Sequence, residues 1–122
     1  MAKILIVEDS ESLRIQLKKC LQAKGHQVCE GHDGKHGLDV LKANTDTKLI
    51  ICDVNMPNMD GVTMCSKVKE DSSISNIPIF MLTTESNAEL KEKGKKVGVK
   101  AWITKPFDET KLLDAVAKIL SM

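Results

Sequence analysis

The sequence predicts an α/β fold in which a five-stranded parallel sheet is covered by helices on both faces. Five short runs of β-branched and other apolar residues alternate with five segments of helical character, so a strand-then-helix unit repeats along the chain. The strand runs lack the polar alternation of a half-exposed sheet, which indicates strands buried on both faces. Helical crossovers that join parallel strands account for both observations.

The expected helices are bounded by residues that commonly start or end a helix. Ser10 is a suitable N-cap for the first helix and Gly25 a suitable end, while Asp33 and Asp60 precede the second and third. The expected strands comprise residues 4–7, 28–29, 49–52, 77–82 and 101–103, and the expected helices comprise about residues 10–24, 35–43, 62–71, 86–96 and 109–120.

The fourth helical segment is the weakest of the five. It has few apolar residues, carries Gly94 in its interior and is rich in lysine. Helices of this kind depend on packing for their stability. We therefore expect a marginal and mobile helix.

Length and charge indicate one domain with no affinity for polyanions. The chain has 122 residues, of which 42% are hydrophobic, so we expect residues 1–122 to form a single domain. The formal net charge is +1, with lysine and arginine spread along the chain, which argues against nucleic-acid and anionic-membrane partners. No apolar stretch approaches the ~18–20 residues of a membrane span, and we expect a cytoplasmic monomer.

The cysteines and histidines do not form a recognisable metal motif. None of the four cysteines belongs to a CxxC pair, and we interpret them as reduced thiols that serve as small apolar residues. They are Cys20, Cys29, Cys52 and Cys65. His32 and His36 stand four apart, but no third ligand is evident, so we interpret them as solvated surface histidines.

Unusual polar residues directly follow four of the expected strands. Glu8 and Asp9 follow the first strand, Asp53 the third, Thr83 the fourth and Lys105 the fifth. In a parallel sheet these positions open onto one edge, where such folds bind ligands. Three carboxylates at one edge repel one another unless a cation compensates. Lys105 and a magnesium ion, which prefers oxygen ligands, are the natural candidates.

Each of these residues also has an ordinary structural explanation. Asp9 or Thr83 could cap the helix that follows it, and Lys105 could be a surface lysine before Pro106. The coincidence of acidic, hydroxyl and basic side chains at four strand ends favours a functional site over four independent explanations.

Four segments carry a family resemblance that extends over the whole chain. They are Val7-Glu8-Asp9-Ser10, Asp53-Val54-Asn55-Met56-Pro57-Asn58-Met59-Asp60-Gly61, Met81-Leu82-Thr83-Thr84 and Lys105-Pro106-Phe107. In this order and spacing they resemble response-regulator receiver domains, and especially the single-domain receivers of chemotaxis. The resemblance implies a doubly wound, flavodoxin-like sheet with strand order 2-1-3-4-5.

The resemblance implies phosphoryl transfer at the strand ends. Asp53 would be the nucleophile that takes a phosphoryl group from a histidine kinase, giving an aspartyl phosphate. Lys105 would pair with one phosphoryl oxygen and Thr83 would hydrogen-bond another. The protein would thus catalyse a reaction on itself rather than act as an enzyme on other substrates.

The resemblance also implies a magnesium site. Asp9 and Asp53 would hold the ion together with the main-chain carbonyl of Asn55, and Glu8 would bind it directly or through water. Glu8 stands where the single-domain chemotaxis receivers have aspartate, although glutamate also occurs there in receivers.

Signal output would use the fourth helix, the fifth strand and the fifth helix. Trp102, at a position where tyrosine or phenylalanine is usual, would change its rotamer when Thr83 moves toward the phosphoryl group. Lys91, Lys95 and Lys111 would offer a basic surface to an acidic segment of a partner protein.

Two polar positions bear on the lifetime of the phosphoryl group. Asn55 and Glu85, each two residues beyond an active residue, would flank the acyl phosphate. Neither is bulky and apolar, so water should reach the phosphorus. We expect a lifetime of minutes rather than hours.

Two other classes of protein fit the residues less well. A phosphatase of the haloacid-dehalogenase type would need its aspartate after the first strand and an acid two residues on, whereas Asp53 follows the third and Asn55 cannot donate a proton as a general acid. A flavodoxin-like cofactor binder would need a phosphate-binding first loop, where Glu8 and Asp9 would repel a phosphate.

Among receivers, two roles remain open. We favour chemotaxis signalling by protein contact, with a flagellar motor switch as a candidate target. The alternative is an intermediate receiver in a multistep phosphorelay. The partner distinguishes the two roles, and the sequence does not contain it.

Overall fold

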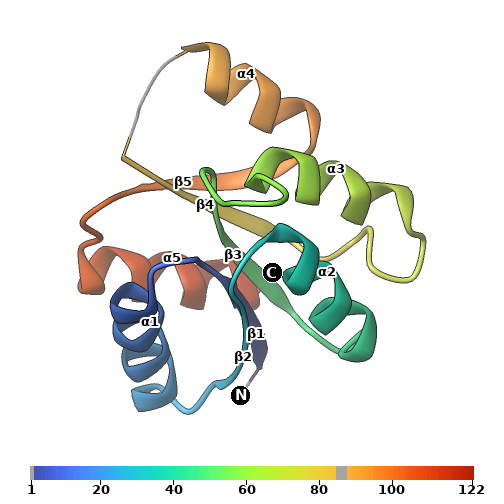
Figure 1. Ribbon diagram of the computed structural model, residues 1–122. Helices are drawn as coiled ribbons and strands as arrows, with labels where there is room; N and C mark the ends of the chain where they lie inside the picture. The colour runs from blue at the N-terminus through green and yellow to red at the C-terminus, as the bar shows by residue number, and fades with distance from the viewer. Residues whose placement is uncertain (1, 85–87) are drawn as a thin grey trace.

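The sheet has the predicted architecture. A computed structural model describes residues 2–84 and 88–122 and contains five parallel strands in the order β2-β1-β3-β4-β5 (Figure 1). The strands are β1 (Lys3–Val7), β2 (Gln27–Gly31), β3 (Leu49–Asp53), β4 (Ile79–Thr83) and β5 (Val99–Thr104). The helices are α1 (Glu11–Ala23), α2 (Gly34–Ala43), α3 (Gly61–Glu70), α4 (Ala88–Lys96) and α5 (Glu109–Leu120).

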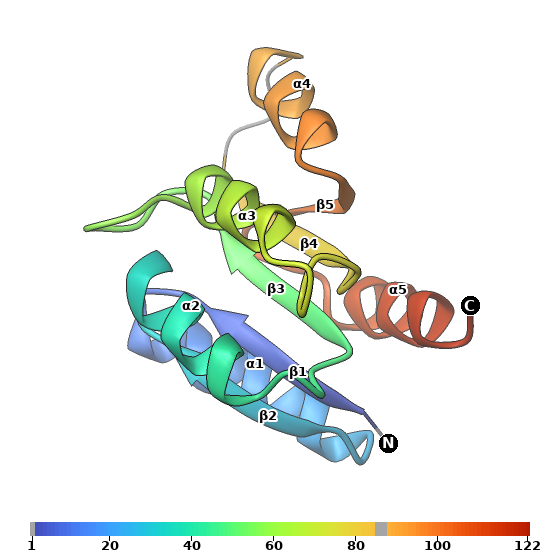
Figure 2. The same ribbon diagram turned by 90° about the vertical axis from the view of Figure 1, so that its right-hand side faces the viewer.

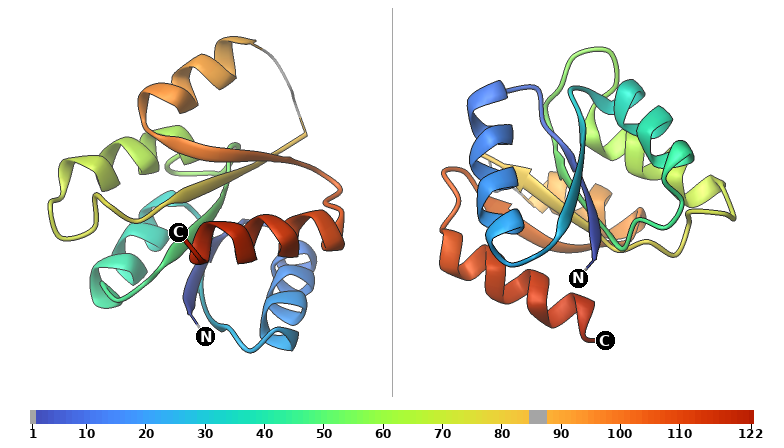
Figure 3. Two further views of the ribbon diagram at one scale, coloured as in Figure 1. Left: turned by 180° about the vertical axis from the view of Figure 1, so that it is seen from behind. Right: turned by 90° about the horizontal axis from the view of Figure 1, so that it is seen from below.

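Helices cover both faces of the sheet and leave its carboxyl edge open. Helices α1 and α5 lie on one face, whereas α2 and α3 lie on the other (Figures 1 and 2). Helix α4 lies beside β5, on the side of α3 and away from α1 and α5 (Figure 3). None of the described helices is both long and apolar enough to span a membrane.

The two faces of the sheet account for the continuous apolar runs. Alternate residues of a strand point to opposite faces, and here both faces are covered. Leu5 of β1 packs in the core with α2 and α3, whereas its neighbours Ile4 and Ile6 pack with α1 and α5, and all three are fully buried. The edge strands β2 and β5 are only partly buried, which corrects the expectation that every strand is buried on both faces.

Helix starts agree with the expected caps to within a residue. The side chain of Ser10 accepts a hydrogen bond from the amide of Leu13, and Asp60 and Asp108 cap α3 and α5 in the same way. Strand ends were predicted less well. Strand β4 begins at Ile79 rather than at residue 77, because Pro78 has no amide hydrogen to donate to the sheet.

The thiols have the predicted state, while one histidine prediction was wrong. Cys20, Cys52 and Cys65 are buried and all four cysteines are free. The His32 side chain is 61% exposed. His36 is half-buried: its Nδ1 accepts a hydrogen bond from the amide of His32, and the two rings stack with centroids 4.1 Å apart. Their i, i+4 spacing therefore serves packing at the start of α2.

Helix α4 is held to the sheet through a small residue. Gly94 is the buried residue of α4, and a Cβ atom built there would lie 2.2 Å from Cζ2 of Trp102. The indole ring of β5 therefore occupies the space that a side chain at Gly94 would need. The mobility expected for this helix stays a prediction, and residues 86 and 87 of the expected helix lie outside the described part of the chain.

Candidate metal centre

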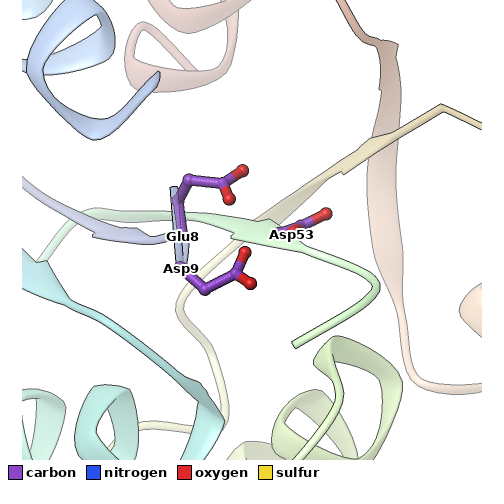
Figure 4. A group of neighbouring side chains, drawn as sticks. All are labelled: Glu8, Asp9 and Asp53. Carbon is purple, nitrogen blue, oxygen red and sulfur yellow. The ribbon is translucent and has the colours of Figure 1, made fainter. Parts of the chain in front are cut away.

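Three carboxylates converge at the carboxyl edge of the sheet. Strands β1 and β3 are neighbours, with Val7 paired to Cys52, so the residues that follow them meet. Glu8, Asp9 and Asp53 each offer a carboxylate oxygen within 4.8 Å of the others (Figure 4). Glu8 and Asp53 are buried, whereas Asp9 is exposed, so the cluster is open to solvent on the side of Asp9.

Lys105 brings a positive charge into this cluster. Its amide donates a hydrogen bond to the Thr83 carbonyl at 2.8 Å, which anchors the chain at the end of β4. Its Nζ lies 2.7 Å from Oε1 of Glu8 and 3.0 Å from Oδ1 of Asp53. Thr83 is 3% exposed at the end of the adjacent strand β4. The structure thus gathers all five residues that the sequence placed at the strand ends.

Burial is the largest cause of the pKa shifts in this cluster. Desolvation raises the pKa of Glu8 and of Asp53, and the hydrogen bonds from Lys105 oppose the rise in both. Burial would lower the pKa of Lys105, but its bonds to Glu8 and Asp53 outweigh this and raise it. A backbone hydrogen bond from Asn55 also lowers the pKa of Asp53. The hydrogen bonds from Lys105 thus offset part of the effect of burial on the pKa of the two carboxylates.

The donor set fits a hard divalent cation. All three side chains present carboxylate oxygens, the ligands that magnesium prefers. The amide of Ser10 donates to Oε2 of Glu8 at 3.0 Å, and the buried Oε1 of Glu8 lies 2.7 Å from Nζ of Lys105. The carboxylate of Asp9 is exposed to solvent and leaves the cluster accessible to an ion. Asp9, Asp53 and Glu8 would hold the ion.

The raised pKa values predict how magnesium stabilisation depends on pH. In the metal-free protein, Glu8 and Asp53 have a pKa above their ordinary 4.5 and 3.8, so their contribution to stability is lost as pH rises through the folded-state pKa. Magnesium requires the ionised form. We expect the gain in melting temperature on adding magnesium to be larger near neutral pH than in the acidic range just above these ordinary values.

Thermal unfolding with and without magnesium at several pH values measures this gain. Asp33 has a lowered pKa, mainly through the His36 amide, so its contribution is lost only below its ordinary 3.8 and outside this range. Calcium-free buffers of matched ionic strength distinguish magnesium binding from the screening of charges by salt. A magnesium effect independent of pH would contradict the assignment of the carboxylates as ligands.

A glycine brings α3 against the backbone of Asp53. The amide of Gly61 donates to the Val54 carbonyl at 2.8 Å, and a Cβ atom at this position would lie 2.2 Å from the carbonyl oxygen of Asp53. Backbone atoms cannot move aside as a flexible side chain can. Only glycine therefore allows α3 to begin so close to the end of β3.

We expect Gly61→Ala to destabilise the fold by about 1–3 kcal/mol, the usual cost of overpacking. The displaced Asp53 backbone should also weaken magnesium binding. Urea unfolding measures the first effect and calorimetric titration the second. Ser66→Ala, an exposed change in the same helix, is the control and should do neither. If Gly61→Ala were as stable as wild type, the prediction would be wrong, and α3 would be free to shift away from the Asp53 backbone.

Several contacts around the cluster could not be predicted from the sequence. Nη1 of Arg14 in α1 donates to the Glu8 carbonyl at 2.7 Å, and Nδ2 of Asn58 donates to Oδ2 of Asp33 at 2.8 Å. The first contact joins residues six apart and the second joins residues 25 apart, and no sequence pattern indicates either of them. The candidate output residues Trp102, Lys91, Lys95 and Lys111 lie on α4, β5 and α5, outside the acidic cluster. Glu85 lies outside the described residues.

Comparison with known proteins agrees with this geometry. Residues 4–117 match the response regulator receiver domain, and the chain belongs to this family. Receiver domains are signalling modules of two-component regulatory systems.

Individual relatives include chemotaxis proteins. The chain is 38% identical to chemotaxis protein CheY1 of Helicobacter pylori over 119 residues, which is 97% of this chain and 96% of that protein. It is 41% identical over 105 residues to Histidine kinase P4 of Formosa agariphila, covering 86% of this chain and 8% of the kinase. The solved structure of Vibrio cholerae chemotaxis protein CheY4 superposes with a TM-score of 0.92 at 39% identity, covering 98% of both chains.

Proposed function

We propose that this receiver accepts a phosphoryl group from a histidine kinase on Asp53, with magnesium bound, and signals by protein contact in chemotaxis. The observation that carries the proposal is Lys105, whose Nζ joins the buried carboxylates of Glu8 and Asp53 at the open edge of the sheet. Relatives named for chemotaxis that match nearly the whole chain support the role.

Each side chain of the cluster has a separate role in phosphoryl transfer. A carboxylate oxygen of Asp53 attacks phosphorus, the new O–P bond forms, and the P–N bond to the kinase histidine breaks with its electron pair leaving on nitrogen. The Lys105 ammonium then moves from carboxylate to phosphoryl oxygen, while the Thr83 hydroxyl donates to another. Magnesium, when bound by Asp9, Asp53, Glu8 and the Asn55 carbonyl, supplies positive charge beside the phosphoryl oxygens.

Loss of the phosphoryl group depends on access for water. Asn55 is exposed and two residues beyond the acceptor, and a polar side chain there does not shield the phosphorus. We propose a lifetime of minutes, with Asn55 and Glu85 as the residues that tune it. Output is proposed on α4, β5 and α5, where Lys91, Lys95 and Lys111 are exposed and positively charged.

A phosphorelay receiver is the second candidate function. The match to a segment that makes up 8% of a histidine kinase favours it, because it likens the chain to part of a larger signalling protein. The two candidate functions differ in how the phosphorylated protein acts on its partner. Transfer of the phosphoryl group onward to a histidine of another protein would favour the relay, and binding without transfer would favour chemotaxis.

The direct test of the proposed function is phosphorylation by acetyl phosphate. The intact mass should rise by one phosphoryl group in the presence of magnesium and should not change when a chelator removes the ion. An unchanged mass in magnesium, with a purified histidine kinase also failing to transfer, would reject the proposed function.

Trp102 should report the phosphorylated state. It is half-buried, pairs with Met81 of β4 two residues before Thr83, and lies three residues before Lys105. Addition of beryllium fluoride with magnesium, which mimics the phosphoryl group, should shift its emission wavelength because the ring moves when Thr83 does. The shift should disappear in Thr83→Ala.

The control is Thr104→Ala, since Thr104 is the exposed partner of Thr83 across the strands. This variant should keep the wild-type shift. An emission spectrum that responds to magnesium alone, and not to beryllium fluoride, would mean that the ring does not follow the acceptor site.

A further inference from the structure

The loop that carries Asn55 contains a strained residue. The amide of Met59 donates to the carbonyl of Pro57 at 2.7 Å, two residues back, so Asn58 is the central residue of a γ-turn. Its φ is 66°, a conformation that residues with side chains rarely adopt and that persists only where surrounding structure enforces it. Asparagine tolerates a positive φ better than most residues with side chains, and a contact from outside the loop also holds Asn58 in place.

This contact comes from the segment between β2 and α2. Nδ2 of Asn58 donates a hydrogen bond of 2.8 Å to Oδ2 of Asp33, which lies between β2 and α2. We call this contact the cross-loop hydrogen bond. Oδ1 of the same carboxylate accepts from the amide of His36 at 2.8 Å, so Asp33 caps α2 with one oxygen and holds the loop with the other.

Three further observations make this contact rigid. Asp33 is 5% exposed, and the bonds from the His36 amide and the Asn58 side chain lower its pKa, so it is an ionised acceptor at neutral pH. Charge-assisted bonds of this kind are the stronger ones. A Cβ atom at Gly34 would lie 2.4 Å from the carbonyl oxygen of Met59, so α2 starts directly against the loop backbone.

The loop is therefore fixed on both sides of Asn55. On one side, the amide of Val54 donates to the Leu82 carbonyl at 3.1 Å and its carbonyl accepts from Gly61. On the other side, the γ-turn at Asn58 and its hydrogen bond to Asp33 hold the loop. Between these two points, the Asn55 backbone bonds to the Asp53 carboxylate.

We propose that Asp33 is a positioning residue of the metal site, which acts through Asn58 to orient the Asn55 peptide. The inference rests on the proposed function, because the Asn55 carbonyl is there a magnesium ligand. Residues that orient the ligands of a metal typically change its affinity by about 10–100-fold when they are replaced.

The test exchanges the two ends of the cross-loop hydrogen bond. Asn58→Asp sets two carboxylates against each other and should weaken magnesium binding by about tenfold, although the added negative charge alone would strengthen it. Combining Asp33→Asn with Asn58→Asp restores the bond in reverse, because the new amide caps α2 through its oxygen and donates its N–H to the new carboxylate. Affinity should return to within about twofold of wild type.

Asn58→Gly separates the hydrogen bond from the backbone strain. Glycine adopts a positive φ freely, so this variant keeps the turn but loses the bond, and it should fold well and still bind magnesium about tenfold more weakly. Calorimetric titration measures affinity. Amide hydrogen exchange of Asn55 and Met59 in the metal-free protein measures the positioning itself, and it should accelerate in both single variants and recover in the exchanged pair.

These measurements also distinguish the two proposals. Wild-type magnesium affinity and wild-type exchange in Asn58→Gly and Asn58→Asp would overturn the positioning role of Asp33. An exchanged pair that stayed as weak as Asn58→Asp would overturn it as well. A wild-type protein that binds no magnesium would instead overturn the proposed function, and the exchange data would still decide whether Asp33 orients the peptide.

Discussion

Asp53→Asn should take up no phosphoryl group from acetyl phosphate or from a histidine kinase. The amide is close in shape to the carboxylate but lacks its nucleophilic charge, so the O–P bond cannot form. The substitution also removes one of two buried carboxylates that share Lys105, and desolvation already raises the pKa of both. The metal-free variant should therefore be at least as stable as wild type.

Intact mass after incubation with donor and magnesium measures the uptake, and thermal unfolding measures the stability. Asp60→Asn is the matched control, because Asp60 caps α3 through the amide of Thr63 and asparagine caps equally well. It should be phosphorylated normally. Wild-type phosphorylation of Asp53→Asn would place the acceptor elsewhere.

The second large effect is expected for Lys105→Ala. The ammonium lies 2.7 Å from Glu8 and 3.0 Å from Asp53, where charge must be neutralised as the phosphoryl group arrives. Removal of one preorganised donor of this kind typically costs about 10²–10³-fold in rate. We expect a loss of that order in phosphorylation, with magnesium binding retained, because bound magnesium would itself neutralise the carboxylates that the lysine contacts in the metal-free protein.

Phosphorylation rates and calorimetric magnesium affinity, measured on the same preparation, separate the two roles. Lys67→Ala, an exposed change on α3, should leave both unchanged. Lys105→Arg keeps the charge but changes the donor geometry, and it should recover only part of the rate. A Lys105→Ala variant that lost magnesium affinity as strongly as phosphorylation would argue against a contact with the phosphoryl group.

The sequence predicted the architecture because its physical signals are local. Apolar runs buried on both faces, caps such as Ser10 and the order of elements all act over a few residues, and they indicated a parallel sheet with helices on both sides. The same logic predicted the acidic cluster, since parallel strands bring Glu8 and Asp53 to one edge without any knowledge of side-chain packing. The strand order came from the family resemblance instead.

The features that the sequence did not predict depend on contacts across the chain. The cross-loop hydrogen bond joins residues 25 apart, and no sequence pattern indicates that Asn58 would contact Asp33. The partial exposure of β2 and β5 follows from their position at the sheet edges, which a run of apolar residues does not reveal. The stacking of His32 on His36 likewise needed the helix start to be in place.

The indole ring of Trp102 packs directly against Gly94, so the ring and α4 cannot move independently. Protein interiors tolerate few voids larger than a water molecule, so the space that an indole leaves must be filled. A ring that withdraws from Gly94 leaves α4 above an empty site, and the helix must then settle inward or admit solvent. A ring that stays keeps the helix in its present position. Together with Leu90 and Val97, which also pack against the core, Trp102 therefore couples the position of α4 to that of β5 through packing.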